Sequence, residues 1–222
     1  MEDQKSIYPT KLSLEDFSPF IEYFTDANHY NTTESKFFSS VYKHEITVTI
    51  QILEHKLDEI AIGKLQYGNH TNIVTILGII EQKQAIVYQD FQGFQMTVGC
   101  YVNNCLRETV ESFPILETIT NTLQWLHSQN IIHGNINAET ALVKSGEIKL
   151  YDLMLNVEDQ KNKTVLDDWK DFINMCQQFF RINLELEESQ LSGEQILAQL
   201  AIVEQSLKVK ASSYWISNCV IL

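Results

Sequence analysis

The sequence predicts an α+β fold with two lobes, in which a small antiparallel sheet precedes a mostly helical part. Between residues 46 and 52, apolar and polar residues alternate with the period-2 pattern of a half-buried strand. In the second half, apolar residues recur at spacings of three and four, as on one face of a helix: Leu116, Ile119, Leu123 and Leu126. Because strands come first and helices later, we expect separate lobes that meet near residues 90–99.

The elements of the first half predict a small lobe over residues 31–93, preceded by an N-terminal extension over residues 1–30. A strand-like pattern extends from Phe37 to Leu53. Residues 55–67 are rich in good helix formers and are expected to form a helix. Two more strands are expected at Ile73–Ile80 and Ala85–Tyr88, joined by a polar turn.

The elements of the second half predict a truncated helical lobe over residues 94–214. After the helix through Leu116, short strands are expected at Ala141–Val143 and Ile148–Tyr151. An amphipathic helix is expected between Trp169 and Phe180, and the last helix begins at a capping box, Ser192-Gly-Glu-Gln195. Residues 215–222 are expected to form a tail.

Composition restricts the classes of function. The chain has 222 residues, of which 44% are hydrophobic, so we expect a packed core rather than disorder. A formal net charge of -13 repels phosphate backbones, so nucleic-acid binding is not expected. Cys100, Cys105 and Cys176 lack the companion ligands of a zinc site and are expected to be free thiols. We find no secretory leader or membrane-spanning run, so we expect a chain that is soluble and cytosolic when made.

A stretch of about thirty residues carries the strongest functional signal. It runs from Trp125-Leu-His-Ser through Ile131-Ile-His-Gly-Asn-Ile-Asn to Ala141-Leu-Val, and then from Glu147 to Asp152. In content and order it resembles the catalytic loop of protein kinases and the two strands after it. Upstream, Val48-Thr-Ile-Gln51 lies where such kinases carry V-A-I-K, and residues 70–74 resemble the H-P-N-I-V motif.

The resemblance implies a phosphate-binding loop and a lysine, and both are altered in this chain. Kinase glycines let the backbone approach the phosphates, but the three positions fall on about Glu34, Lys36 and Ser39. Gln51 stands at the lysine position and carries no charge. Glu59 stands at the position of the lysine's glutamate partner; its alternative role is a solvated helix face.

The catalytic loop is altered as well. His133-Gly134-Asn135 replaces H-R-D, so an amide that is no base at neutral pH stands where a carboxylate accepts the substrate proton. Asn137 replaces the loop lysine, and Thr140 lies where a metal-binding Asn belongs. The triplet is similar to that of the pseudokinase domains of Janus kinases. We expect His133 to be structural, donating a hydrogen bond within the helical lobe; the alternative is a catalytic role.

Other positions of the family's site are vestigial or changed. Asp152 is the remaining metal candidate, either as a ligand or as a cap of a strand end, and we expect no cofactor. A vestigial nucleotide cleft is expected at Val41, Thr49, Gln51, Gln89 and Asp90, with Gln89 as the gatekeeper. The resemblance also implies that Asp167 or Asp168 caps the next helix and binds catalytic-loop amides.

The sequence printed here ends in Cys219-Val-Ile-Leu, which fits the C-a-a-X prenylation motif, and a final Leu favours a geranylgeranyl group. The alternative is an apolar tail packed on the helical lobe. Prenylation predicts processing by prenylation enzymes and a cytoplasmic, peripheral membrane location through Cys219.

The leading interpretation is a catalytically inactive, kinase-like interaction or scaffold protein that binds an unidentified protein partner. The alternative is an enzyme, either a divergent active kinase or a nucleotidyl transferase that uses Asp152 and a metal.

Overall fold

A computed structural model describes residues 10–19, 21–22, 35–53, 70–90, 96–105, 112–151 and 163–219. The described residues divide into two compact units. The first lies within Met1–Thr97 and Leu142–Asn162, and the second within Val98–Ala141 and Lys163–Leu222. The expected helix over residues 55–67 with Glu59 lies outside the described residues, as do Glu34 and Asp152.

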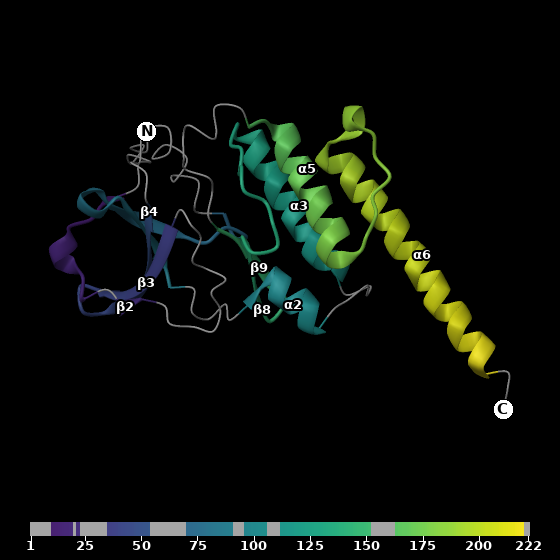
Figure 1. Cartoon of the computed structure of the whole chain (residues 1–222), viewed down its shortest axis with the longest axis horizontal. Helices are drawn as coiled ribbons and strands as arrows, with labels where there is room; N and C mark the ends of the chain where they lie inside the picture. The colour runs from purple at the N-terminus through teal and green to yellow at the C-terminus, as the bar shows by residue number, and fades with distance from the viewer. Residues whose placement is uncertain are drawn as a thin grey trace, which may run out of the picture. The chain divides into compact units, whose positions relative to one another are not determined.

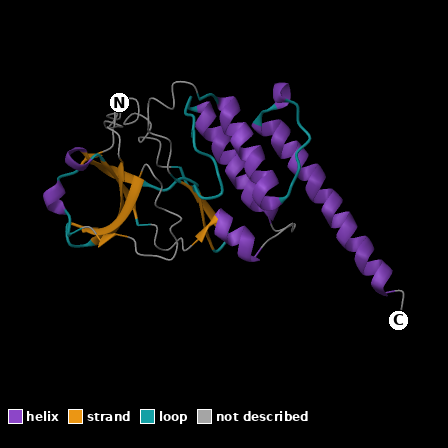
Figure 2. Cartoon of the chain, viewed as in Figure 1, coloured by secondary structure: helices purple, strands orange, loops and turns teal. Residues whose placement is uncertain are grey.

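The first unit is built on a six-stranded sheet with the order β1-β5-β6-β4-β3-β2 (Figures 1 and 2). Its strands are β1 (Thr10–Lys11), β2 (Ile21–Glu22), β3 (Ser35–Tyr42), β4 (Ile46–Leu53), β5 (Ile76–Ile80) and β6 (Ala85–Gln89). All neighbours pair antiparallel except β1 and β5, which are parallel. The antiparallel sheet expected from the sequence is therefore present.

The strand-like run from Phe37 to Leu53 is two strands rather than one. β3 and β4 form a hairpin in which Tyr42 pairs with Ile46. Lys43 and His44 in the turn have φ of 48° and 59°, and positive φ matches the twist of hairpin strands. Alternation alone does not show such a turn, because the turn residues are themselves polar.

Residues expected to form an N-terminal extension are part of this sheet. Residues 10–22 contribute β1 and β2 to its two edges. Leu12, Leu14 and Phe17 also pack against the buried cluster of one sheet face, which consists of Val48, Ile50, Ile80, Ala85 and Val87. The segment before residue 31 thus supplies apolar cover that the sheet needs.

A second sheet has the order β7-β8-β9, with β7 at Met96–Thr97, β8 at Ala141–Lys144 and β9 at Glu147–Leu150. The residues of the H-P-N-I-V-like motif fasten β9 within the first unit. Leu150 donates its N–H to the Asn72 carbonyl (2.8 Å) and accepts from Val74 N–H (2.9 Å). The Asn72 side chain donates to the Ile148 carbonyl (3.1 Å), so this motif fixes the position of the strand end.

The second unit is helical, with α2 (Val98–Cys105), α3 (Phe113–Ser128), α5 (Val165–Met175) and α6 (Gly193–Cys219). A π-helical turn, Cys176–Phe180, follows α5, and a short 3₁₀ turn occurs at Glu188–Gln190. Two other 3₁₀ turns, Leu14–Asp16 and Glu81–Lys83, lie in the first unit. α3 packs against α6, and Figure 1 shows α6 extending beyond α3 and α5. The expected tail boundary at residue 215 falls inside α6.

Helix starts follow the local sequence. At α5, the Thr164 hydroxyl accepts from Asp167 N–H, and the Asp167 carboxylate accepts from Thr164 N–H, which is a capping box. At α6, the Ser192 hydroxyl accepts from Gln195 N–H (3.3 Å), which is one of the two hydrogen bonds of the expected box. Gly193 lies directly over the Gln124 side chain of α3, where a Cβ would approach Gln124 Cγ to 2.1 Å.

Candidate functional site

The loop of residues 133–140, in the second unit, is held by hydrogen bonds among the residues that differ from a kinase loop. The Asn137 side chain donates to Asn135 Oδ1 (2.9 Å), and its own Oδ1 accepts from Glu139 N–H (2.8 Å) and Thr140 N–H (3.1 Å). The Thr140 hydroxyl donates to the Asn135 carbonyl (2.7 Å). The loop therefore places Asn135, Asn137 and Thr140 together, as their spacing predicts, and neutral groups satisfy one another there.

Asp168 supports this loop from the first turn of α5. Its fully buried carboxylate accepts from His133 N–H (2.8 Å) and Gly134 N–H (2.7 Å), and it also contacts His127 Nε2 (2.8 Å). The aspartate pair thus divides the two expected tasks: Asp167 caps the helix and Asp168 binds the loop amides.

The environment of Asp168 keeps its carboxylate charged. Burial raises its pKa, but the hydrogen bond with His127, the electrostatic interaction with His133 and the N–H groups of Gly134 and His133 outweigh burial. The pKa of Asp168 therefore lies below its usual value. Trp169 packs edge-on against the His127 ring, with centroids 4.9 Å apart, and encloses the contact.

His133 is completely buried. Its Nδ1 accepts from the N–H of Asn135, two residues further along the loop (3.3 Å). In this hydrogen bond His133 is the acceptor, whereas from the sequence we expect it to donate.

Gln51, in the first unit, is buried and bonded to a tyrosine. The Tyr88 hydroxyl donates to Gln51 Oε1 at 2.6 Å, and both side chains are buried. In β4, Gln51 is opposite Phe37 of β3 and Ile86 of β6, while Thr49 is opposite Tyr88. Since alternate residues of a strand share a face, Val41, Thr49, Gln51 and Tyr88 lie on one face of the sheet.

Two assignments made from the sequence are corrected by this register. Gln89 is exposed and pairs with Val48, so its side chain lies on the opposite face of the sheet from Gln51, whereas Tyr88 lies on the same face as Gln51. A shift of one residue moves a strand side chain to the opposite face, which explains the error. Lys36 and Ser39 are not in a loop, since both lie inside β3 and Ser39 pairs with Thr49. Asp90 lies at the end of β6, where its Oδ1 accepts from the Thr49 hydroxyl (3.5 Å).

Phe37 and Tyr151 form a contact that sequence reasoning missed. Their rings meet edge to face, with centroids 5.7 Å apart, and both side chains are buried. Tyr151 follows Leu150, whose backbone is fixed by Asn72 and Val74, and this places its ring against β3. Tyr151 precedes Asp152 in the motif that carries the resemblance. The large aromatic side chain at this position was the signal in the sequence that could have indicated a buried contact.

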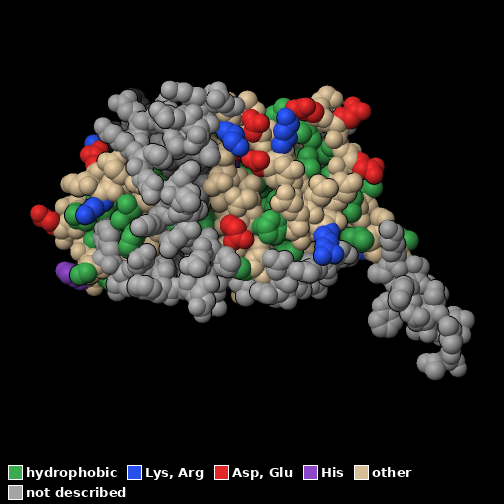
Figure 3. Space-filling view, viewed as in Figure 1, with side chains coloured by type: hydrophobic (Ala, Val, Ile, Leu, Met, Phe, Trp, Pro, Cys, Tyr) green, Lys and Arg blue, Asp and Glu red, His purple; other side chains and the backbone are tan. Residues whose placement is uncertain are grey.

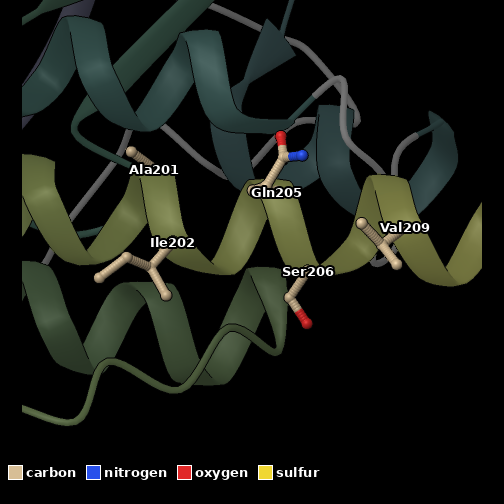
Figure 4. Close-up of a pocket in the computed structure, with 5 residues that line it drawn as sticks. All are labelled: Ala201, Ile202, Gln205, Ser206 and Val209. Carbon is tan, nitrogen blue, oxygen red and sulfur yellow. The ribbon is translucent and has the colours of Figure 1, made fainter.

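The surface offers a separate apolar groove on α6. It has a volume of about 610 Å³ and is lined by Ala201, Ile202, Gln205, Ser206 and Val209 (Figure 4). None of the site residues named above lines it. On the face that Figure 3 shows, the described acidic and basic side chains are interspersed. Within the described part of the chain, no group of three or more His, Cys, Asp or Glu could hold a metal ion.

Comparison with known proteins agrees with the loop geometry and the sheet. Residues 32–176, more than half of the chain, match the family of protein tyrosine and serine/threonine kinases. The chain belongs to this kinase family. It is also 32% identical over 133 residues to the probable serine/threonine-protein kinase PknB of Lactococcus lactis subsp. lactis (strain IL1403). That match covers 51% of this chain and 21% of the relative, so the chain spans only about a fifth of the relative's length.

Family membership confirms the kinase-like α+β fold expected from the motif around His133. Among the residues that the structure describes, no helix is long and apolar enough to cross a membrane.

Proposed function

We propose that this member of the kinase family is a catalytically inactive interaction protein. The observation that carries the proposal is the state of Asn135. Its loop is supported by Asp168, yet its side chain is a neutral amide that accepts a hydrogen bond from Asn137. The loop around Asn135 is therefore held in a defined conformation, but it lacks the carboxylate that would accept the substrate proton.

The changes at the other family positions point the same way. Phosphoryl transfer depends on positioning and on charge that balances the phosphates. Gln51 offers no charge, and its carbonyl oxygen is bonded to Tyr88. Asn137 stands at the loop lysine position and closes the loop on itself. Loss of single groups of this kind costs orders of magnitude in rate, so losing several together removes catalysis.

The proposal includes a protein partner and a lipid anchor. A kinase fold without catalysis retains a large surface for binding other proteins, and the partner is not identified by any feature described above. The anchor applies to a protein that ends at Leu222, where prenylation enzymes would modify Cys219. The backbone of Cys219 lies at the end of α6, so the lipid would follow a helix that begins in the packed helical unit.

A second candidate, an active enzyme, is favoured by the family match and by the name of the bacterial relative. In this version a divergent kinase or nucleotidyl transferase uses Asp152 with a metal ion. Asp152 lies outside the described residues, and a single carboxylate makes a weak metal site by itself.

The two candidates are separated by label transfer from radioactive ATP to the protein and to generic substrates, with Mg²⁺ or Mn²⁺. We expect no transfer by the wild type, and none by Asn135→Asp, because the phosphates remain unpositioned. Transfer by the wild type that disappears in Asp152→Ala would establish the enzyme, since contamination would not depend on that residue. The folded state of each variant is checked by circular dichroism.

A further inference from the structure

On one face of the six-stranded sheet, four buried side chains are linked by strand register, a hydrogen bond or a ring contact. Phe37, opposite Gln51 in the register, is 1% exposed, and Tyr151, against its ring, is 3% exposed. Tyr88 is 2% exposed and donates its hydroxyl hydrogen bond to Gln51, which is completely buried. We call these four residues, Phe37, Gln51, Tyr88 and Tyr151, the internal plug.

The internal plug is fixed from several sides. Phe37, Gln51 and Tyr88 lie on three adjacent strands, β3, β4 and β6, whose pairing has no shift between them. Tyr151 is placed by Leu150, which is hydrogen-bonded on both sides to residues 72–74. Buried polar groups require partners, and the Tyr88 hydroxyl meets this need for the Gln51 carbonyl. The plug is therefore bonded and packed by the chain's own side chains.

The chemistry of the plug does not suit a nucleotide. Its members are three aromatic rings and one amide, and none of the four is positively charged. A triphosphate would have to displace a buried aromatic contact and a 2.6 Å hydrogen bond, and it would gain no cation from these residues. An uncharged aromatic molecule, by contrast, would fit the space that one of the rings now fills.

We propose that the internal plug replaces the nucleotide in this chain, so that the first unit is held in its folded form by its own side chains and not by a ligand. The proposal rests on the proposed function and adds that the nucleotide site is filled rather than merely weakened. In this arrangement, the rings of Phe37 and Tyr151 fill the space that a nucleotide would occupy. The hydrogen bond between Tyr88 and Gln51 replaces the ion pair that a kinase lysine forms with a glutamate.

The experiment measures thermal shifts of the full chain with ATP, ATP with Mg²⁺, adenosine and indole. The variants are Phe37→Ala and Tyr151→Ala, each of which removes a ring from the plug. The matched control is Phe38→Ala, which removes the same atoms from the next residue of β3. Phe38 is only partly buried and packs against the cluster on the other sheet face, so its loss leaves no enclosed space. An enclosed apolar cavity left by a removed ring binds a small aromatic molecule.

We expect the wild type to show no shift with ATP or adenosine, and indole to raise the melting temperature of Phe37→Ala and Tyr151→Ala by a few degrees but not that of Phe38→Ala. A nucleotide shift of the wild type, with no label transfer, would overturn the plug and leave the proposed loss of catalysis intact. Equal indole responses in all three variants would also overturn it. If the alanine variants do not fold, Phe37→Leu is tested in their place. The thermal shift of the wild type with ATP and adenosine then still decides whether the nucleotide site is filled.

Discussion

Removing the Asp168 carboxylate should be among the most damaging single changes in the second unit. Asp168→Ala leaves the buried N–H groups of His133 and Gly134 without their acceptor. An unsatisfied buried donor costs about 1–3 kcal/mol, so two such donors predict a loss of about 2–6 kcal/mol, and the lost contact with His127 adds to it. Since domains are stable by about 5–15 kcal/mol, this loss is a large fraction of the total.

The assay is urea unfolding followed by tryptophan fluorescence, because Trp169 packs on His127 and reports on this region. The matched control is Asp167→Ala, which removes only the two hydrogen bonds that the Asp167 carboxylate accepts from the Thr164 N–H and hydroxyl, on the exposed side of the same helix start, and should cost much less. A loss below about 1 kcal/mol for Asp168→Ala, or a loss equal to that of Asp167→Ala, would refute the supporting role.

The same carboxylate predicts a pH dependence. Burial raises the pKa of Asp168, but its hydrogen bonds and its electrostatic interaction with His133 lower it by more, so the folded-state pKa lies below the unfolded one. A lowered pKa contributes stability that is complete above the unfolded value of about 3.9 and is lost as the pH falls through the folded value. The free energy of unfolding of the wild type should therefore fall below about pH 4, and that of Asp168→Asn should fall less steeply. Parallel curves for the two proteins would contradict this.

Two further predictions concern single contacts, and a third concerns the C-terminal motif. Tyr88→Phe removes the donor to buried Gln51 and should cost about 1–3 kcal/mol in urea unfolding, whereas no loss would mean that the bond is dispensable. Gly193→Ala places a Cβ against the Gln124 side chain, so either that side chain shifts or α6 moves away from α3, at a cost of about 1–3 kcal/mol; an unchanged urea midpoint would contradict this crowding. For a protein that ends at Leu222, Cys219→Ser should move it from membrane to cytosolic fractions. One lipid chain without a basic patch binds a membrane reversibly, so the wild type should be partly released from membranes at low ionic strength. Equal distribution of the wild type and Cys219→Ser between membrane and cytosolic fractions would exclude the anchor.

Much of the candidate site could be predicted because its residues are contiguous. The loop around His133 lies within one motif, and the hydrogen bonds among Asn135, Asn137 and Thr140 span at most five residues. Local spacing fixes such contacts, so the sequence also predicts which chemical groups stand at the catalytic positions. The strands and helices could be predicted for the same reason, since each depends on a short apolar period.

Contacts between distant segments could not be predicted in the same way. The choice between Asp167 and Asp168 depends on how α5 lies against a loop more than thirty residues earlier, and both residues are consistent with the local pattern. The choice between Tyr88 and Gln89 depends on the pairing of β6 with β4, and a shift of one residue in that pairing exchanges the two faces.

The sequence by itself indicated that this chain belongs with the kinases, and it predicted that the catalytic loop lies around His133 and that Asn135 and Gln51 stand in place of charged groups. These are properties of residue identity within short motifs, and folding cannot change them. Only the tertiary structure decided that Gln51 bonds to Tyr88 and that Phe37 meets Tyr151. The physical reason is that strand register brings together Gln51 and Tyr88, which are 37 residues apart, and the anchoring of β9 brings together Phe37 and Tyr151, which are more than one hundred residues apart. No local pattern encodes these distances.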